Sequence, residues 1–455
     1  MKKIWMAAIA VVVAAVAVSL IALPRGEDWS TDSPAAREEF LAAVDAMMKL
    51  YHPEARAHLE RAVELDPDFL VAKVYLAEQV SRDDRDRAKQ LIEEVIAADT
   101  SVLGPRERLI VERARANHER RYDDAVRMID DYLEEHPDDP YFLHVKALRT
   151  WITGDFDEAE RLNRRLIEIA PNWVIAYNQL GYIAMSQGRF VEAEEYFSKY
   201  RFVAPDQANP HDSLGELYII TGRYDEAEET LWRSLGIKPD FWAAYDHLVL
   251  ARVSRGDLEG AEEILATLRA GGDCPEMWLT RIECMIRLER LASASRWREV
   301  IELGEELPGC LEGSMSSRAK AVTHLAATLL GERELAQAVE DRVAKLVAEV
   351  QEDRSKGELP DILALQAHLR GVRLALGGDL EGALESFKEA DHHLSYMQAD
   401  SGLSKLCNRL AMVEVLLAAG EDGKAHQLLS KVRSVNPPMA DDFEERGLKI
   451  LGLER

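Results

Sequence analysis

Residues 174–207 read VIAYNQLGYIAMSQGRFVEAEEYFSKYRFVAPDQ, and residues 208–241 read ANPHDSLGELYIITGRYDEAEETLWRSLGIKPDF. The two stretches align without a gap, and their proline, glycine and alanine residues recur along the chain at one step of 34 residues. The recurring positions are Pro137, Pro171, Pro205 and Pro239; Gly154, Gly188, Gly222 and Gly256; and Ala125, Ala159, Ala193, Ala227 and Ala261. Because three residue types with different steric roles share one period, the sequence predicts a solenoid of stacked units.

Each unit is expected to form two antiparallel helices. In 174–207, apolar and small residues recur at helical spacing on both sides of Gly188. Glycine accepts the left-handed conformation that ends a helix, and Pro205 cannot continue the helix before it. Small residues such as Gly181 let the paired helices approach closely. The same features place five tandem units at 106–139, 140–173, 174–207, 208–241 and 242–275.

The flanking regions keep the period less strictly. Upstream units extend the predicted array to 36–275, although 70–105 is degenerate. The phase is lost over 276–363, where we expect atypical helical pairs, and it returns in C-terminal units at 364–439. Residues 440–455 are expected to form a tail or a capping helix. The helices predicted in the irregular region are Trp278–Leu291, Arg296–Glu306, Ser317–Leu330 and Glu334–Glu352.

The N-terminal residues carry a different signal. Two lysines precede Ile4–Leu23, a run of twenty residues in which one serine is the only polar residue. Twenty helical residues span about 30 Å, the thickness of the hydrocarbon core of a membrane. The run is interpreted either as an uncleaved transmembrane anchor or as a cleaved signal peptide. The lysines predict a cytoplasmic tip at 1–3, with the chain after a linker at 24–35 lying outside the cytoplasm.

Charge and cysteine content narrow the function classes. The chain has 56 basic and 82 acidic side chains, a formal net charge of −26, which argues against nucleic acid as a partner. Its four cysteines are too few and too scattered for a disulfide framework or a zinc site. Cys274 and Cys284 pair if the chain lies in an oxidising compartment, and otherwise serve as small buried apolar residues.

The residues predict neither catalysis nor a cofactor or metal site. His211, Asp212 and Ser213 are triad residue types, but neighbours on a helix point in different directions and cannot form a hydrogen-bonded relay. Asp391, His392 and His393 lack a further metal ligand placed by the sequence. We therefore expect a binding protein rather than an enzyme.

The repeated residues resemble the tetratricopeptide repeat (TPR) family. The resemblance rests on Leu180-Gly181, Gly188, Ala193, Phe197 and Pro205, repeated by Leu214-Gly215, Tyr218, Ala227 and Pro239. It implies an all-α, right-handed superhelix of antiparallel helix pairs that binds a protein or peptide partner in its concave groove. The groove residues that it implies are Tyr141, His144, Leu148, Trp151, Ile152, Ile175, Asn178, Tyr182, Met185, Ser186, Asn209, Asp212, Glu216, Ile219 and Ile220. For the apolar residues among them, the alternative is that they pack between helices.

Residues 104–110 and 209–216 also resemble TPR arrays of bacterial regulatory proteins, without the effector domains found there. The leading hypothesis is a TPR scaffold anchored by residues 4–23 in a bacterial inner membrane, with its array on the periplasmic side. The alternative is a sensory module that binds a small ligand or peptide and signals by a change of shape.

Overall fold

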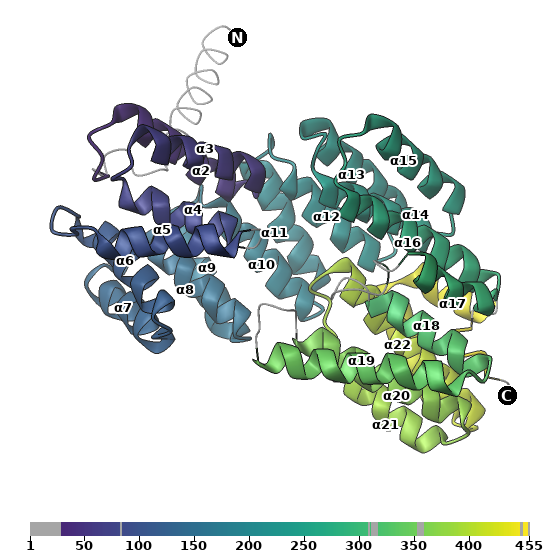
Figure 1. Cartoon of the computed structure of the whole chain (residues 1–455). Coiled ribbons are helices and arrows are strands. Elements are labelled where there is room, and N and C mark those ends of the chain that lie inside the picture. The colour runs from purple at the N-terminus through teal and green to yellow at the C-terminus, as the bar shows by residue number, and fades with distance from the viewer. Residues whose placement is uncertain are drawn as a thin grey trace, which may run out of the picture. The chain divides into compact units, whose positions relative to one another are not determined.

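The computed structural model describes residues 29–81, 84–307, 310, 317–352, 359–445 and 449–453. Over these residues the chain is all-α, with 23 helices that form a solenoid of antiparallel pairs (Figure 1). The predicted membrane segment 4–23 lies outside the described residues. Among the helices that are described, none combines the length and the apolar character needed to cross a membrane. The chain divides into two compact units, and each is described by itself.

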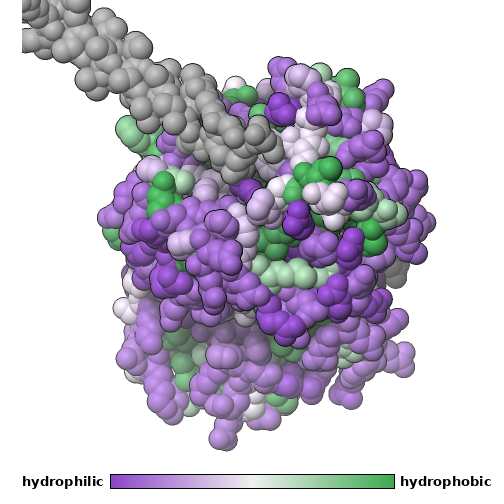
Figure 2. All heavy atoms as spheres, turned by 90° about the vertical axis from the view of Figure 1, so that its left-hand side faces the viewer, coloured by the Kyte–Doolittle hydropathy of each residue, from purple (hydrophilic) through white to green (hydrophobic). Residues whose placement is uncertain are grey.

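The first compact unit comprises Met1–Leu180 and Phe202–Ala204. Its fully buried core includes the rings of Phe40, Phe69 and Phe142. Figure 2 views the molecule from the side on which α2–α7 lie, and there hydrophilic residues cover most of the surface with hydrophobic ones scattered among them. The helices of this unit are α2 (Pro34–Met48), α3 (His52–Leu65), α4 (Leu70–Val80), α5 (Arg85–Ala97), α6 (Pro105–His118), α7 (Tyr122–Glu135), α8 (Pro140–Ile152), α9 (Phe156–Ile169) and the first part of α10 (Val174–Ser186).

The second compact unit comprises Gly181–Arg201 and Pro205–Arg455. After the end of α10 come α11 (Phe190–Val203), α12 (Asn209–Ile220), α13 (Tyr224–Ile237), α14 (Trp242–Ser254), α15 (Leu258–Gly271), α16 (Glu276–Ser293), α17 (Trp297–Glu306), α18 (Ser317–Leu329) and α19 (Arg333–Glu352). The C-terminal helices are α20 (Leu359–Leu376), α21 (Leu380–His393), α22 (Ala399–Ala418), α23 (Asp422–Val435) and α24 (Pro437–Glu445).

The five predicted units are confirmed as helix pairs from α6 to α15. Their second helices begin at Tyr122, Phe156, Phe190, Tyr224 and Leu258, so the step of 34 residues is kept. The turn between the two helices needs a residue with positive φ, and Gly188 supplies it at φ 74°. In the unit 106–139 the equivalent residue is Arg120, which adopts φ 60° without being a glycine.

The predicted close approach within a helix pair is also confirmed. A Cβ atom added to Gly181 would lie 2.3 Å from Cε1 of Phe197, and one added to Gly215 would lie 2.6 Å from Cδ2 of Leu231. Both partner side chains are fully buried. Each glycine therefore lets the second helix of its unit press a large side chain against the backbone of the first.

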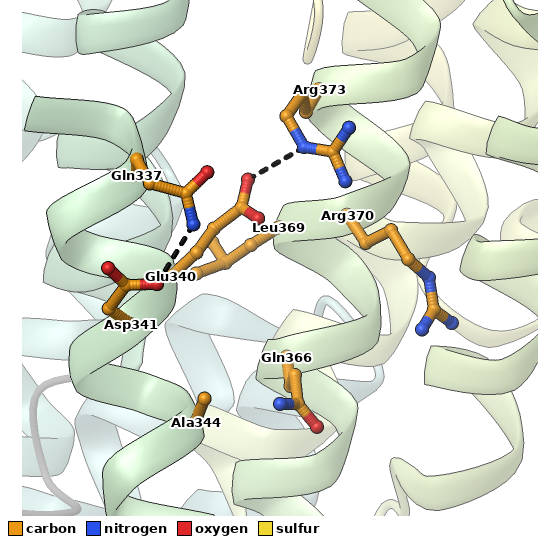
Figure 3. A pocket seen from close by; sticks show the side chains of 8 residues that line it. All are labelled: Gln337, Glu340, Asp341, Ala344, Gln366, Leu369, Arg370 and Arg373. Carbon is orange, nitrogen blue, oxygen red and sulfur yellow. Dashed lines mark hydrogen bonds and ion pairs between the residues drawn. The ribbon is translucent and has the colours of Figure 1, made fainter. Parts of the chain in front are cut away.

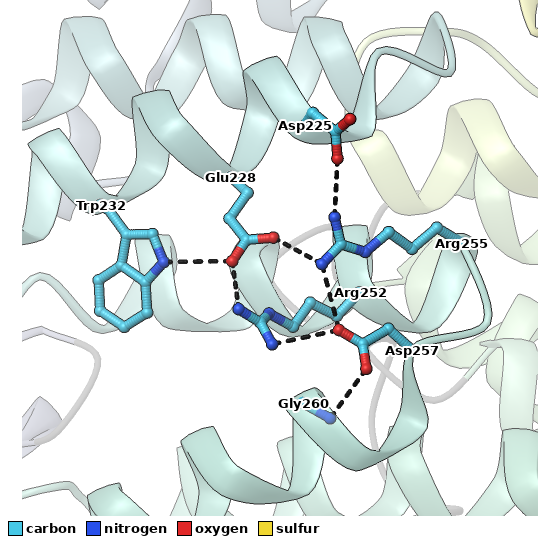
Figure 4. A network of polar contacts seen from close by, with 7 residues as sticks. All are labelled: Asp225, Glu228, Trp232, Arg252, Arg255, Asp257 and Gly260. Carbon is cyan, nitrogen blue, oxygen red and sulfur yellow. Dashed lines mark hydrogen bonds and ion pairs between the residues drawn. The ribbon is translucent and has the colours of Figure 1, made fainter.

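An ion-pair network joins neighbouring units at α13, α14 and α15 (Figure 4). Glu228 accepts hydrogen bonds from Arg252 and, at 2.8 Å, from Arg255. The same two guanidinium groups each donate to Asp257 at 3.1 Å. Asp257 also caps α15 by accepting from the backbone N–H of Gly260 at 3.0 Å. Because α13 ends one unit and α14 begins the next, the network fixes their relative register.

The irregular region forms helices close to the predicted ones, namely α16 to α19. These helices have 18, 10, 13 and 20 residues, against 13 or 14 in α8 and α9, and this variation in length is why the sequence loses the 34-residue phase.

The disulfide considered from the sequence requires a correction. Cys284 pairs with Cys310, with their Cα atoms 5.6 Å apart, and Cys274 is a buried free thiol. The hairpin of α16 and α17 returns the chain past Cys284, and Cys310 follows directly after that hairpin. The sequence separation alone did not reveal this return.

Candidate functional site

Helix α12 is the most enclosed helix of the second compact unit. Every one of its residues from Asn209 to Ile220 is buried, including several polar ones. Part of the cover comes from α22, where Gly402 approaches so closely that an added Cβ would lie 2.9 Å from Cδ1 of Ile220. The chain therefore folds its own C-terminal helices onto the first helix of the unit 208–241.

A charged cluster lies beneath this cover. Asp212 and Glu216 stand one turn apart on α12, and His247 reaches them from α14. The Nδ1 atom of His247 lies 2.8 Å from Oδ1 of Asp212, and its Nε2 atom lies 3.3 Å from Oε1 of Glu216. The hydroxyl of Tyr182 donates to Oε2 of Glu216. Both ring nitrogens of His247 thus face carboxylates, which is the arrangement of an imidazolium ion.

The first turn of α22 completes the cluster. Its N-cap residue, Gln398, makes no side-chain cap, and Oε1 of Glu216 accepts from the backbone N–H of Ala399 at 3.1 Å instead. A carboxylate at a helix N-terminus is favoured because it meets unpaired N–H groups and the positive end of the helix dipole. Beside it, Arg281 of α16 bridges Asp246, at 2.8 Å, and Asp400 of α22.

The cluster keeps His247 charged. Burial lowers the pKa of this imidazole, but the negative charges of Asp212 and Glu216 outweigh burial and raise it to about 10. Burial and the neighbouring Glu216 raise the pKa of the Tyr182 hydroxyl well above its usual value. At neutral pH His247 is therefore a bound cation that cannot act as a general base.

The same three residues are the group among the described residues best placed to hold a metal ion. Asp212, Glu216 and His247 each offer one ligand atom, and these atoms lie within 4.8 Å of one another. A metal bound there would have to displace a proton of His247 and the contact with Ala399. The hydrogen bonds already satisfy these ligand atoms, so the arrangement is best explained as a structural charge network.

A second anchor holds the C-terminal helices at the end of α12. The fully buried amide of Asn436, between α23 and α24, donates to the carbonyl oxygens of Ile219 and Ile220 at 3.4 and 3.1 Å. It also lies 3.2 Å from the hydroxyl of Tyr224. Both carbonyl groups belong to the last turn of α12, where helical N–H partners run out. The carbonyl of Ile219 also accepts from the backbone N–H of Gly222 at 3.2 Å, whereas Asn436 supplies the donor for the carbonyl of Ile220.

The predicted groove residues of the first compact unit lie outside the charged cluster, and several of them are only partly buried. Tyr141 is partly buried beneath the guanidinium group of Arg106, which lies 5.3 Å from the ring centre. His144 is partly buried with its Nδ1 atom enclosed, and burial lowers the pKa of this imidazole to about 4. Trp151 is partly buried near the end of α8, and Asn178 is buried in α10.

The predicted groove residues of the second compact unit are buried, except for Tyr182 and Ser186, which are partly buried. The structure brings Tyr182, Asp212 and Glu216 together in the charged cluster. Met185 is fully buried in the apolar core, and Asn209 donates to the hydroxyl of Tyr200 at 3.2 Å. A role of these residues in partner binding stays a prediction, and in the structure α12 is covered by the chain's own helices.

Sequence reasoning did not single out four residues in or beside the cluster. Asp246 lies 34 residues after Asp212, so carrying the period into the next unit would have found it. His247 is one position further and has no counterpart in the family pattern of groove positions. Arg281 and Asp400 lie outside the regular units, and no local signal marks them.

A comparison with models of protein families supports the repeat assignment over the central part of the chain. A family model described as Tetratricopeptide repeat matches residues 113–172, 153–213 and 178–240. No curated protein matches the chain. A solved tetratricopeptide repeat protein from Parabacteroides merdae ATCC 43184 is 17% identical, with 56% of this chain and 93% of that chain covered and a TM-score of 0.39. The solved APC/C hetero-tetramer Cut9-Hcn1 is 13% identical, with coverage of 91% and 97% and a TM-score of 0.41.

Proposed function

On the premise that this chain is a tetratricopeptide repeat protein, we propose that it is a scaffold that binds a protein or peptide partner. Stacked repeats of this kind present extended surfaces that are suited to binding. We further propose that the chain is not an enzyme, because His247, the imidazole of the charged cluster, is held as a cation between two carboxylates.

The observation that carries the proposal is an apolar surface on α8. Leu148 and Ile152 stand one turn apart at predicted groove positions, and they are 37% and 76% exposed. Trp151 lies beside them and is partly buried. Large apolar side chains exposed together on one helix are typical of a binding surface, and an aromatic residue among them is a common anchor. We call Leu148, Trp151 and Ile152 the α8 surface.

The charge of the chain defines the kind of partner. With a net charge of −26, the protein attracts basic molecules and repels acidic ones. The α8 surface is therefore proposed to take an apolar side chain of a partner segment that also carries basic residues. Salt should slow the association, because long-range attraction between charges is screened.

Site-specific crosslinking tests this function. A photoreactive amino acid placed at Ile152 of the full chain should capture one partner in cells. The matched control carries the same group at Val191, which is 77% exposed but lies on α11, a second helix of its unit. Ile152→Asp should then weaken binding of the captured partner by about tenfold or more, and Val191→Asp should leave it unchanged. Equal capture at both positions would refute the α8 surface.

We also propose that residues 4–23 anchor the chain in a bacterial inner membrane and that the array lies on the periplasmic side. The Cys284–Cys310 disulfide supports this location, because disulfides persist in oxidising compartments and are rare in the cytosol. A reporter enzyme that is active only outside the cytoplasm, fused after residue 455, should be active. Cysteine labelling of cells without reductant should leave Cys284 unreacted, and labelling of this cysteine would contradict the proposed location.

A further inference from the structure

A cavity of about 290 Å³ lies between α19 and α20, in the part of the chain where the repeat period fails (Figure 3). Residues one turn apart on each helix line it, among them Gln337, Glu340, Gln366, Leu369 and Arg373. The volume is close to the lower end of the range for small-ligand pockets. The repeat pattern does not account for this cavity.

Glu340 presents one free carboxylate oxygen to the cavity. Its Oε1 atom accepts from Nε2 of His324 at 2.9 Å and from Nε of Arg373 at 3.0 Å. Among the described residues, no group donates to its Oε2 atom. His324 is fully buried, so it holds Glu340 from behind in a fixed orientation.

Two further groups face the same space with unused hydrogen-bonding capacity. Arg373 binds Glu340 through Nε, which leaves its two terminal nitrogen atoms without a partner in the described part of the chain. The amide of Gln366 likewise meets no hydrogen-bonding group among the residues that the structure describes. A carboxylate oxygen, a guanidinium edge and an amide thus line one cavity.

The other polar residues of the cavity are already engaged. Arg370 is turned away from Glu340, as Figure 3 shows, and binds Ser386 at 3.0 Å and Glu389 of α21. Asp341 accepts from Gln337 at 2.9 Å. The available charges are therefore one negative and one positive, and they stand in contact with each other.

We propose that this cavity binds a free α-amino acid. The guanidinium edge of Arg373 takes the carboxylate of the ligand, Oε2 of Glu340 takes its ammonium group, and Gln366 contacts its polar side chain. In an α-amino acid the two charged groups are bonded to the same carbon atom, which matches a donor and an acceptor already joined at 3.0 Å. A longer zwitterion would place one of its charges away from its partner. This site is separate from the α8 surface, and neither proposal requires the other.

The test measures binding of each standard amino acid to the full chain, first by thermal unfolding and then by titration calorimetry. A ligand that binds only the folded state raises the unfolding midpoint, and the rise grows with the logarithm of ligand concentration once this exceeds the dissociation constant. At least one α-amino acid should bind, and L-2-aminobutyrate should bind about tenfold or more tightly than its isomer 4-aminobutyrate. Absence of binding by every amino acid up to about 10 mM, or equal binding of the two isomers, would overturn the proposal.

Two arginine variants supply the matched comparison. Arg373→Gln should weaken amino-acid binding by about tenfold or more, because it removes the partner of the ligand carboxylate. Arg370→Gln removes the same charge from the same helix, but its side chain binds α21, so it should leave the affinity unchanged. An equal loss in both variants would assign the binding to general charge and overturn the site.

Discussion

Replacing Gly181 with alanine tests whether the close approach of paired helices sets the stability of a unit. Gly181 lies in the middle of α10, where alanine is intrinsically better than glycine by about 1 kcal/mol. The added Cβ would lie 2.3, 2.6 and 2.7 Å from Cε1, Cδ1 and Cζ of Phe197. The propensity of the helix and the packing of the core therefore predict effects of opposite sign.

The structure decides which effect is larger. Carbon atoms pack at about 3.5 to 4.0 Å, so the new methyl group would overlap three ring atoms by about 1 Å. Phe197 is fully buried, and its ring cannot swing into open space. Overpacking of this kind costs about 1 to 3 kcal/mol, and a rigid ring places the cost near the upper end. After the gain in helix propensity, we expect Gly181→Ala to lower the free energy of unfolding by about 2 kcal/mol.

The assay is urea denaturation followed by circular dichroism, with Gly236→Ala as the matched control. Gly236 is also a helical glycine, but an added Cβ would meet no atom within 4 Å. This control should raise stability by about 0.5 to 1 kcal/mol. Shortening Phe197 to leucine in the Gly181→Ala background should recover part of the loss. If Gly181→Ala stabilises the protein as Gly236→Ala does, the packing argument is refuted.

Three further outcomes follow from named contacts. The pKa of His247 is raised from 6.5 to about 10, so the charged imidazole stabilises the folded state fully below about pH 6.5, and this stabilisation disappears as the pH rises toward 10. The urea concentration at the unfolding midpoint should therefore fall over that pH range, and His247→Gln should remove this dependence on pH. Reduction of the Cys284–Cys310 disulfide, which closes a loop across 26 positions, should lower the free energy of unfolding by about 3 kcal/mol, as measured by urea denaturation. In Cys310→Ser, addition of dithiothreitol should no longer change this free energy. Asn436→Ala leaves the buried carbonyl group of Ile220 without a donor, so it should cost about 2 kcal/mol and speed amide hydrogen exchange in α24, whereas exchange unchanged in α24 would contradict the anchor.

The regular helix pairs could be predicted from the sequence because their causes are local. A glycine such as Gly188 ends a helix through its own backbone conformation, and Pro205 stops the next helix through its own ring. The small residue Gly181 and its partner Phe197 are only 16 positions apart, within one unit. Local signals of this kind also sufficed for the helices of 276–352, although not for their arrangement.

The charged cluster could not be predicted because its contacts cross many repeats. Glu216 and Ala399 are 183 positions apart, and the period describes only neighbours one step away. The sequence showed Asp212 and Glu216 at groove positions, but it could not tell whether water, a partner or another part of the chain would satisfy them. The pairing of Cys284 with Cys310 escaped prediction for the same reason, since it depends on where a hairpin returns.

The buried charges of α12 specify where α22 binds rather than how tightly it binds. Apolar side chains such as Leu403 and Leu406 share one core with α12 and supply the attraction, but apolar contacts allow neighbouring positions along a helix. A shift of α22 by one turn would remove the N–H of Ala399 from Glu216, which keeps only Tyr182 and His247 as partners, and the lost hydrogen bond to this buried carboxylate should cost about 1 to 3 kcal/mol. One seating of α22 avoids this cost, so we infer that Glu216 fixes the register of the C-terminal helices on the repeat array.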